Sequence, residues 1–495
     1  MNGFLDGFYN IVGILNGIVW SNWLVYLCLF VGIFFTVVTR FVQIRQLPEM
    51  VRMIFGKRDG GSKEGVSSYQ SFMITVAARV GTANIVGVAV AIAYGGPGAV
   101  FWMWTLAILG AATSFVECTL AQTYKLELDG EYRGGTTYFI DKALHAKWLA
   151  MIFAVLTAVA FCIAGPGVHS NAMASALNLT FGIDPTITGI LLVVLMGFVS
   201  MGGIKRLAAV SEKITPVMAM VYLLLTVILM LTNITKIPQV IAMIVTSAFG
   251  QNALFGGILG SALSYGIMRG IYSNEAGLGT ATMAAAAAET SHPVKVGLIQ
   301  SLSVYIDTLV VCTCTAFIIL VTDCYNVFDS NGEMIVENLP GIEEGIGYAI
   351  SAVNTILSNF GGILVTLVLV VFSFSTLMTT YYSGETNVAY IFKSPKARKI
   401  GIYVSRIFVL LMTFYGTQVA VSDVFSLADL GFGAMAWVNI LSIVLLSKVA
   451  LKLLRDYEAQ KKQGKDPVFD PEKLGIKDAD LWNKIKKKYQ KENNV

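Results

Sequence analysis

Charged side chains are concentrated in two short stretches of this 495-residue chain, and the rest of it is almost free of them. Residues 40–64 and 448–495 make up 73 residues and hold 30 of the 66 charged side chains, so the other 422 residues hold only 36. Soluble domains carry about 25% charged residues. A chain with 13% charged and 55% hydrophobic residues cannot build a soluble surface over such a remainder. The sequence therefore predicts an all-α protein that crosses a membrane many times.

Eleven stretches of the chain are long and apolar enough to cross a bilayer, which takes about 20 residues. The predicted spans are 21–40, 68–94, 98–124, 148–166, 185–203, 214–232, 252–290 with an interruption, 294–322, 361–384, 402–418 and 421–447. Four shorter segments are predicted to form amphipathic helices, namely 2–19, 167–181, 238–250 and 343–358.

The basic residues gather in loops that would lie on one side of the membrane. Loop 40–67 has six Lys or Arg, whereas loop 323–360 has none and six Asp or Glu. The tail 448–495 adds thirteen Lys or Arg. Because cytoplasmic loops are enriched in Lys and Arg, we expect a multi-pass plasma-membrane protein with its N-terminus outside and its C-terminus in the cytoplasm.

Two of the predicted spans are interrupted by similar sequences. The segments Arg79–Gly87 and Arg269–Gly277 both fit the pattern R-x4-N-x2-G, and both continue into a run of small residues. Each lies in the first span of a five-span block, and the charge pattern makes the two blocks run in opposite directions. An inverted repeat with two broken helices has this signature, and its broken helices mark the binding site. The alternative is a pair of glycine-rich surfaces for helix packing.

The inverted repeat predicts four regions of the chain. They are 1–67 with an amphipathic helix, an extra transmembrane helix and a cytoplasmic loop, 68–232 as the first five-helix repeat, 233–447 as the second, and 448–495 as a basic cytoplasmic tail.

Each break exposes helix ends at membrane depth. The half-helix that begins at 82–84 presents free N–H groups and the positive end of its dipole, which suit a carboxylate. The carbonyl ends of the preceding half-helices, near 77–79 and 265–269, suit an ammonium group or a sodium ion.

Several motifs resemble the alanine/glycine:cation symporter family over about residues 15–450. They are Gly95–Gly110 with its Phe-Trp-Met-Trp core, Ser273–Gly279, Asp307–Thr313 and Phe372–Thr376. The segment Thr380–Asn387 is more similar to the bacterial subgroup that carries alanine or glutamine. The resemblance implies a LeuT-like five-plus-five fold with one added helix. It also implies import of a small neutral amino acid (alanine, glycine or glutamine) by alternating access, with sodium as the coupling ion and no other cofactor.

The breaks and the resemblance together give the candidate site residues. The substrate is expected at Gly81, Thr82, Ala83, Asn84, Tyr272, Ser273, Asn274 and Thr380, and sodium at Ala77, Ala78, Gly81, Ser375 and Thr376. For the two hydroxyls the alternative is a bond to their own helix.

Residue 380 bears on the size of the substrate. Many alanine- and glycine-carrying relatives have Trp where this chain has Thr380. We expect a pocket large enough for glutamine, unless neighbouring side chains fill the space.

A charged side chain inside a membrane span costs free energy, so such residues are functional candidates by default. Arg79 and Arg269 are expected to snorkel or to pair with Glu117, Glu275 or Asp307, and structural pairing is favoured for Arg269. A substrate contact is equally open for Arg79. Glu117 and Asp307 occupy matching places in the two blocks, where they serve as ion-pair scaffolding or in proton coupling.

Other functions find less support in the sequence. No nucleophile–base pair, HExxH motif or P-loop is present, so we expect no enzyme. A channel needs a symmetric ring of carbonyls or charges. No basic patch with interleaved aromatics indicates nucleic acid, and the basic stretch Lys484–Lys488 is predicted to be solvated or to rest on anionic membrane lipid. Proton-coupled symport and an ion channel remain the alternatives.

Overall fold

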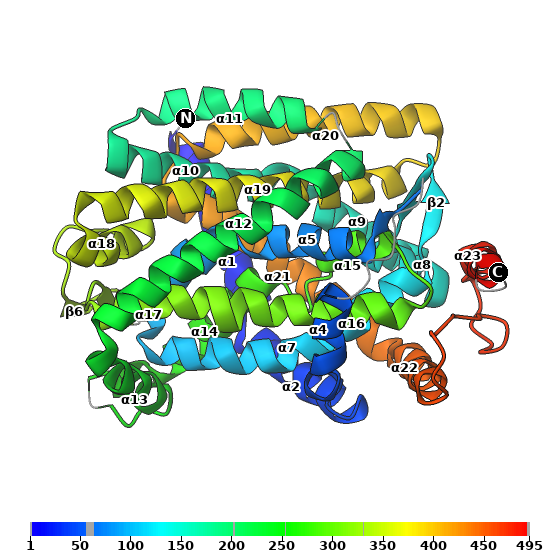
Figure 1. Ribbon diagram of the computed structural model, residues 1–495. Coiled ribbons are helices and arrows are strands. Elements are labelled where there is room, and N and C mark those ends of the chain that lie inside the picture. Colours follow the sequence, from blue (N-terminus) through cyan, green and yellow to red (C-terminus); the bar gives the residue numbers. More distant parts are fainter. Residues whose placement is uncertain (1, 56–63, 201–202, 253, 330, 493–495) are drawn as a thin grey trace.

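The computed structural model describes residues 2–55, 64–200, 203–252, 254–329 and 331–492, which form a bundle of long helices lying roughly side by side (Figure 1). Two helices, α1 (Asn2–Val19) and α2 (Asn22–Val38), precede the broken helix, and the short α3 (Val42–Arg45) and α4 (Leu47–Phe55) follow them.

The next part of the chain contains the first broken helix and the helices that follow it. Its elements are β1 (Val66–Ser67), α5 (Ser68–Arg79), the π-helical turn η1 (Ala83–Gly87), α6 (Val88–Gly95), α7 (Gly98–Thr123), β2 (Leu126–Leu128), β3 (Glu131–Arg133), α8 (Thr136–Ala143), α9 (Lys147–Val159), the π-helical turn η2 (Ala160–Ala164), α10 (Gly165–Phe181), α11 (Pro185–Ser200) and α12 (Gly203–Thr232).

The remaining membrane part repeats this order after a connecting segment. The connection holds η3 (Ile234–Lys236), α13 (Ile237–Ala248) and η4 (Gly256–Ile258). The repeated elements are α14 (Leu259–Asn274), α15 (Ala281–Ala286), β4 (Ala288–Glu289), α16 (Pro293–Val304), the π-helical turn η5 (Tyr305–Cys312), α17 (Thr313–Val321), β5 (Asn326–Phe328), β6 (Met334–Glu337), α18 (Ile346–Leu357), α19 (Asn359–Ile391), α20 (Pro395–Gly416) and α21 (Val421–Leu445).

The two halves of the bundle share one sequence of elements. In each, the second long helix leads into an antiparallel hairpin, β2–β3 or β5–β6, then a short helix, α8 or α18, and then the third long helix. Helices that hold the same place in the two halves also contact one another. Helix α7 packs on α16, α10 on α19 and α11 on α20. The predicted internal repeat is thus visible in the order and the packing of the elements.

The two broken helices run in opposite directions. Strands β1 and β4 pair in parallel, with Val66 opposite Ala288, so the start of the first broken helix lies beside the end of the second. At the other end, a Cβ built on Gly95 would lie 3.2 Å from the Cα of Ala262, so the first broken helix ends beside the start of the second. This antiparallel arrangement confirms the predicted inverted pair.

Helix lengths confirm a multi-pass membrane protein. Within the described residues eight helices are long and apolar enough to cross a membrane, and the α5–α6 pair, bent by 49°, makes nine. Predicted span 185–203 corresponds to α11, which has only 16 residues, and span 252–290 to the separate helices α14 and α15. The total of eleven spans therefore stays a prediction.

The predicted boundary between a span at 148–166 and an amphipathic helix at 167–181 is wrong. Helices α9 and α10 form one continuous helix over Lys147–Phe181. Proline inside a helix removes a backbone donor and clashes with the preceding turn. Here Pro166 lies two residues after the end of the wider π-helical turn η2, and the chain stays helical through it.

The charged tail folds back on one end of the bundle. Helices α22 (Ser447–Lys462) and α23 (Leu481–Glu492) lie at the end that carries β2 and α8, whereas α13, α18 and β6 lie at the opposite end (Figure 1). Helix α23 exposes Lys484 but buries Trp482 completely, and the indole N–H of Trp482 donates to the carbonyl oxygen of Gln122 over 3.1 Å. The tail therefore contacts the membrane part directly.

Candidate functional site

A small cavity lies where the two helix breaks meet. It is lined by Ala78, Arg79, Gly81, Thr82, Ala83, His169, Tyr272, Glu275, Thr376, Thr380 and Phe432. Its volume is about 10 Å³, which is roughly the space for one water molecule. The side chains around it must move apart before an amino acid fits.

The predicted sodium residues come together beside this cavity. The hydroxyl of Thr376, on α19, donates to the carbonyl oxygen of Ala77 over 3.0 Å, and the hydroxyl of Ser375 lies 3.5 Å from the same oxygen. Both hydroxyls also bond to the carbonyl oxygen of Phe372 in their own helix, at 3.1 and 2.8 Å. The bond within the helix and the contact across to the broken helix therefore coexist.

Gly81 allows α19 to approach the break this closely. A Cβ built on Gly81 would lie 2.1 Å from the hydroxyl oxygen of Thr376, which no real side chain tolerates. The residue at this position must therefore be glycine for the hydroxyl to reach the broken helix.

At the first break, the side chains of Thr82 and Asn84 already have partners. The amide oxygen of Asn84 reaches back and accepts the backbone N–H of Gly81 at 2.7 Å, as in the second half of a capping box. The hydroxyl of Thr82 lies 3.0 Å from Nδ1 of His169 and 2.8 Å from Oγ of Ser373. What this break offers a ligand is therefore mainly its backbone.

At the second break, only Tyr272 among the three predicted substrate residues lines the cavity. The hydroxyl of Ser273 donates to Oδ2 of Asp307 at 2.9 Å. The amide of Asn274 accepts the N–H of Ala276 at 3.0 Å and donates to Oγ1 of Thr308 at 3.3 Å. Ser273 and Asn274 thus tie the break to η5.

Asp307 joins the two breaks. It is completely buried, and its carboxylate accepts bonds from Asn84 at 2.6 Å, Ser273 at 2.9 Å and Thr308 at 2.7 Å. Its counterpart Glu117 in α7 is equally buried and accepts the amide N–H of Asn439 at 2.8 Å. Both carboxylates therefore accept hydrogen bonds from uncharged side chains of neighbouring elements.

The two buried arginines do not form the predicted pairs. Arg269 forms a two-point ion pair with Asp429 of α21, at 3.1 and 3.2 Å, instead of pairing with Glu117, Glu275 or Asp307. This pairing depends on tertiary structure, because the fold places Asp429 of α21, 160 residues further along the chain, beside Arg269 near the end of α14.

Arg79 binds neutral acceptors. Its guanidinium donates to the carbonyl oxygen of Gln300 and to Oγ of Ser114, both at 3.0 Å, and also to Oγ of Ser303. Among the described residues no carboxylate lies within ion-pair distance of it.

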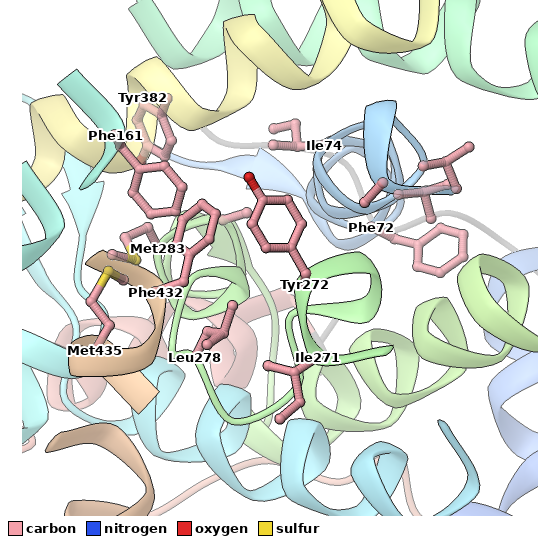
Figure 2. Close-up of a cluster of buried hydrophobic side chains, with 14 of the residues drawn as sticks. Phe72, Ile74, Phe161, Ile271, Tyr272, Leu278, Met283, Tyr382, Phe432 and Met435 are labelled. Atoms are coloured by element: carbon pink, nitrogen blue, oxygen red, sulfur yellow. The ribbon is translucent and has the colours of Figure 1, made fainter. Parts of the chain in front are cut away.

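An aromatic cluster closes one side of the cavity. The ring of Tyr272 lies 4.8 Å from that of Phe432 and 5.7 Å from that of Phe425, and Phe161 lies 5.4 Å from Phe432. Figure 2 shows Tyr272 between the rings of Phe161 and Phe432 on one side and helix α5 on the other. The guanidinium of Arg269 lies 5.2 Å from the ring of Phe425.

Two larger cavities lie beyond this cluster. Their volumes are about 430 and 560 Å³, and both are lined by Glu343, Glu344, Val421 and Phe425. Since Glu343 and Glu344 lie just before α18, these cavities belong to the end of the bundle that carries the acidic loop 323–360. The aromatic cluster thus separates them from the central cavity.

Two residues of α19 and one of the second break complete the cavity wall. Thr380 lies one helical turn after Thr376, and both line the cavity. Glu275 lines it as well, although the sequence indicated this residue only as a partner for an arginine. The sequence contained a signal for this position in the cavity wall, because Glu275 directly follows Asn274 inside the break.

Comparison with known proteins agrees with this arrangement. The model of the sodium:alanine symporter family matches residues 5–471. The putative sodium/proton-dependent alanine carrier protein YrbD of Bacillus subtilis (strain 168) is 49% identical over 96% of this chain and 97% of that protein. The probable sodium/glutamine symporter GlnT of the same organism is 45% identical over 93% of each chain.

A more distant relative supports the same assignment. The sodium/alanine symporter AgcS of Methanococcus maripaludis is 36% identical over 93% of this chain and 99% of that protein. The predicted resemblance and the prediction that the protein is not an enzyme are both confirmed, since the family and these relatives are carriers. This chain belongs to the sodium:alanine symporter family.

Proposed function

We propose that this protein carries a small neutral amino acid across the membrane together with sodium, by alternating access to the central cavity. The observation that carries the proposal is the position of this cavity, which is bordered by both broken helices of an inverted pair. Discontinuous helices supply substrate and ion sites in carriers of this kind.

The carboxylate of the substrate binds at the start of the second half of the first broken helix. The first N–H groups of a helix have no partner inside it, and the positive end of the dipole attracts an anion. Asn84 occupies the N–H of Gly81, which leaves those of Thr82 and Ala83 at the wall of the cavity.

Sodium binds between α5 and α19. Hard cations take oxygen ligands, and the hydroxyls of Ser375 and Thr376 meet the carbonyl oxygen of Ala77 at the end of α5. The next residue, Ala78, lines the cavity and would add its carbonyl oxygen. Gly81 keeps the two helices close enough for one ion to bridge them. A single cation would thereby couple the broken helix to α19.

The cargo is alanine or glutamine. Relatives at 49% and 45% identity are named for alanine and glutamine. Thr380 borders the cavity, and its small hydroxyl leaves more room than an indole and can bond to a side-chain amide.

The orientation follows the charge pattern. We assign 68–232 and 233–447 to the two repeats, the acidic end with α18 to the outside and the tail 448–495 to the cytoplasm, near anionic lipid headgroups. All six native cysteines are buried, so single cysteines introduced at Asn331 and Lys484 can be labelled selectively. An impermeant reagent applied to intact cells should label the first and not the second, and the reverse pattern would contradict the orientation.

Coupling to protons is the second candidate. The carboxylates of Asp307 and Glu117 are buried without a cationic partner within ion-pair distance among the described residues, and relatives are named sodium/proton-dependent. A protonated carboxyl there would also be compatible with their neutral hydrogen-bond partners.

Equilibrium binding tests the proposal. Purified protein is titrated with radiolabelled L-alanine while sodium chloride replaces choline chloride at constant ionic strength. The affinity for alanine should rise with sodium at constant pH. An affinity that is independent of sodium but rises as the pH falls would favour proton coupling, and an affinity that responds to neither would contradict symport.

A further inference from the structure

Glu275 is an acid in an unusual position. Its backbone has φ of 55°, in the left-handed region, directly after the last residue of α14. Glycine occupies the other left-handed positions of this turn, Gly277 and Gly279. A residue with a side chain is strained in this conformation, and such strain is concentrated at ligand sites. The turn thus retains a carboxylate where glycine would be easier to accommodate.

The carboxylate of Glu275 lacks a cationic partner. It is only 6% exposed, and its Oε2 accepts the hydroxyl of Thr280 at 2.7 Å. Within the described part of the chain no Lys, Arg or His lies within ion-pair distance of it. Arg269 pairs with Asp429, and Arg79, which lines the same cavity, donates its hydrogen bonds to neutral oxygens instead. A buried charge is costly unless it is paired. The missing partner is therefore expected to be a ligand.

The position of Glu275 indicates the chemistry of that ligand. Glu275 comes from the second break, and Thr82 and Ala83 come from the first, yet all three border the same small cavity. The first break presents N–H groups, which bind a carboxylate, and Glu275 presents an anion. An α-amino acid carries its carboxylate and its ammonium on one carbon, so both groups must be received within one such small space.

We propose that Glu275 binds the ammonium group of the transported amino acid. This inference rests on the proposed function and deepens it, because it names the group that requires the substrate to have a free amine. Substrate binding would then neutralise the buried carboxylate and join the two broken helices through one zwitterion. The hydroxyl of Thr280 acts as a positioning group that orients the carboxylate.

A substitution that removes only the charge provides the test. Purified full-length protein in saturating sodium is probed with radiolabelled L-alanine, and unlabelled L-lactate, which carries a hydroxyl in place of the ammonium, is the competitor. Glu275→Gln should weaken alanine binding at least tenfold and change lactate competition less than threefold, so that the preference for alanine over lactate falls at least threefold.

Two further variants separate ammonium binding from a structural role. Glu275→Asp keeps the charge and should retain more of the preference for alanine than Glu275→Gln does. Glu344→Gln is the matched control, because this acid lines the outer cavities and bonds to Tyr94 instead; it should leave the preference unchanged.

The opposite results overturn the inference. If Glu275→Gln binds alanine as tightly as the unaltered protein, or weakens alanine and lactate equally, Glu275 does not receive the ammonium. If Glu275→Gln does not fold, Thr280→Val takes its place: this variant removes the hydroxyl that orients the carboxylate and should lower the preference for alanine over lactate, and an unchanged preference would contradict the inference. Absence of sodium-dependent alanine binding in the unaltered protein would instead remove the proposed function, and this inference with it.

Discussion

The hydroxyl oxygen of Thr376 lies 3.0 Å from the carbonyl oxygen of Ala77, across the space between α19 and the end of α5. Two neutral oxygens from different helices meet there beside the central cavity. Because helix carbonyl ends attract cations, this contact is where the proposed sodium ion would join the two helices.

Replacing Thr376 by Val keeps its shape and removes the hydroxyl. A bond between a hydroxyl and a charged group contributes about 1.5–3 kcal/mol, so the sodium concentration for half-maximal transport should rise about tenfold or more. Alanine affinity should fall at low sodium and recover at saturating sodium, because the two ligands share one coupling free energy.

Thr379→Val is the control for this measurement. Its hydroxyl bonds to the carbonyl oxygens of Ser375 and Thr376 in its own helix, at 3.2 and 2.9 Å. Sodium dependence should be unchanged in this variant. The same unchanged dependence in folded Thr376→Val protein would exclude this sodium site.

Gly81→Ala tests the close approach of the two helices. The added methyl group would lie 2.1 Å from the hydroxyl oxygen of Thr376, so the side chain or α19 must move. Sodium-driven uptake should be lost or strongly reduced. Gly87→Ala in the same broken helix adds a methyl group at an ordinary 3.5 Å from Cβ of Ala83, and it should transport normally. Equal activity of the two variants would mean that the approach at Gly81 has no functional role.

Thr380→Trp tests the size of the pocket. Overpacking costs about 1–3 kcal/mol, and the larger substrate should bear most of it. Glutamine uptake should therefore fall well below alanine uptake when both are measured on the same proteoliposomes. Equal losses would show that Thr380 supports the fold, and no loss would show that it does not face the substrate.

The sequence predicted the parts of this architecture that have a local signal. The pattern that begins at Arg79 and again at Arg269 identified both helix breaks. Each break contributes residues to the wall of the central cavity. The sequence did not predict the partner of Arg269, because Asp429 is brought there only by the packing of α21. Nor did it show that Ser273 and Asn274 would turn toward η5, since side-chain direction at a helix break depends on tertiary contacts.

The fold of the tail was likewise not predictable from its composition. A charged stretch is typically solvated, yet Trp482 is fully buried and packs at 5.1 Å from the ring of Phe469. Phe469 in turn donates its backbone N–H to the carbonyl oxygen of Ser291 over 2.9 Å. These contacts fasten the tail to the start of α16.

Trp482→Ala should release the tail from this surface. Truncating a buried Trp costs about 3–5 kcal/mol, and the segment between α22 and α23 should become accessible to protease. Limited proteolysis of purified protein measures this. Lys484→Ala, on the same helix with a side chain that is 79% exposed, should be cleaved at the rate of the unaltered protein. Equal cleavage of both variants would mean that the tail is not held through Trp482.

Uptake into proteoliposomes tests the central claim most directly. Purified protein is reconstituted, and radiolabelled L-alanine uptake is followed with sodium outside and choline inside, and again with equal sodium on both sides. Symport predicts that alanine accumulates transiently above its external concentration only under the inward sodium gradient. Alanine that merely equilibrates, to the same level with and without that gradient, would contradict sodium-coupled transport by this protein.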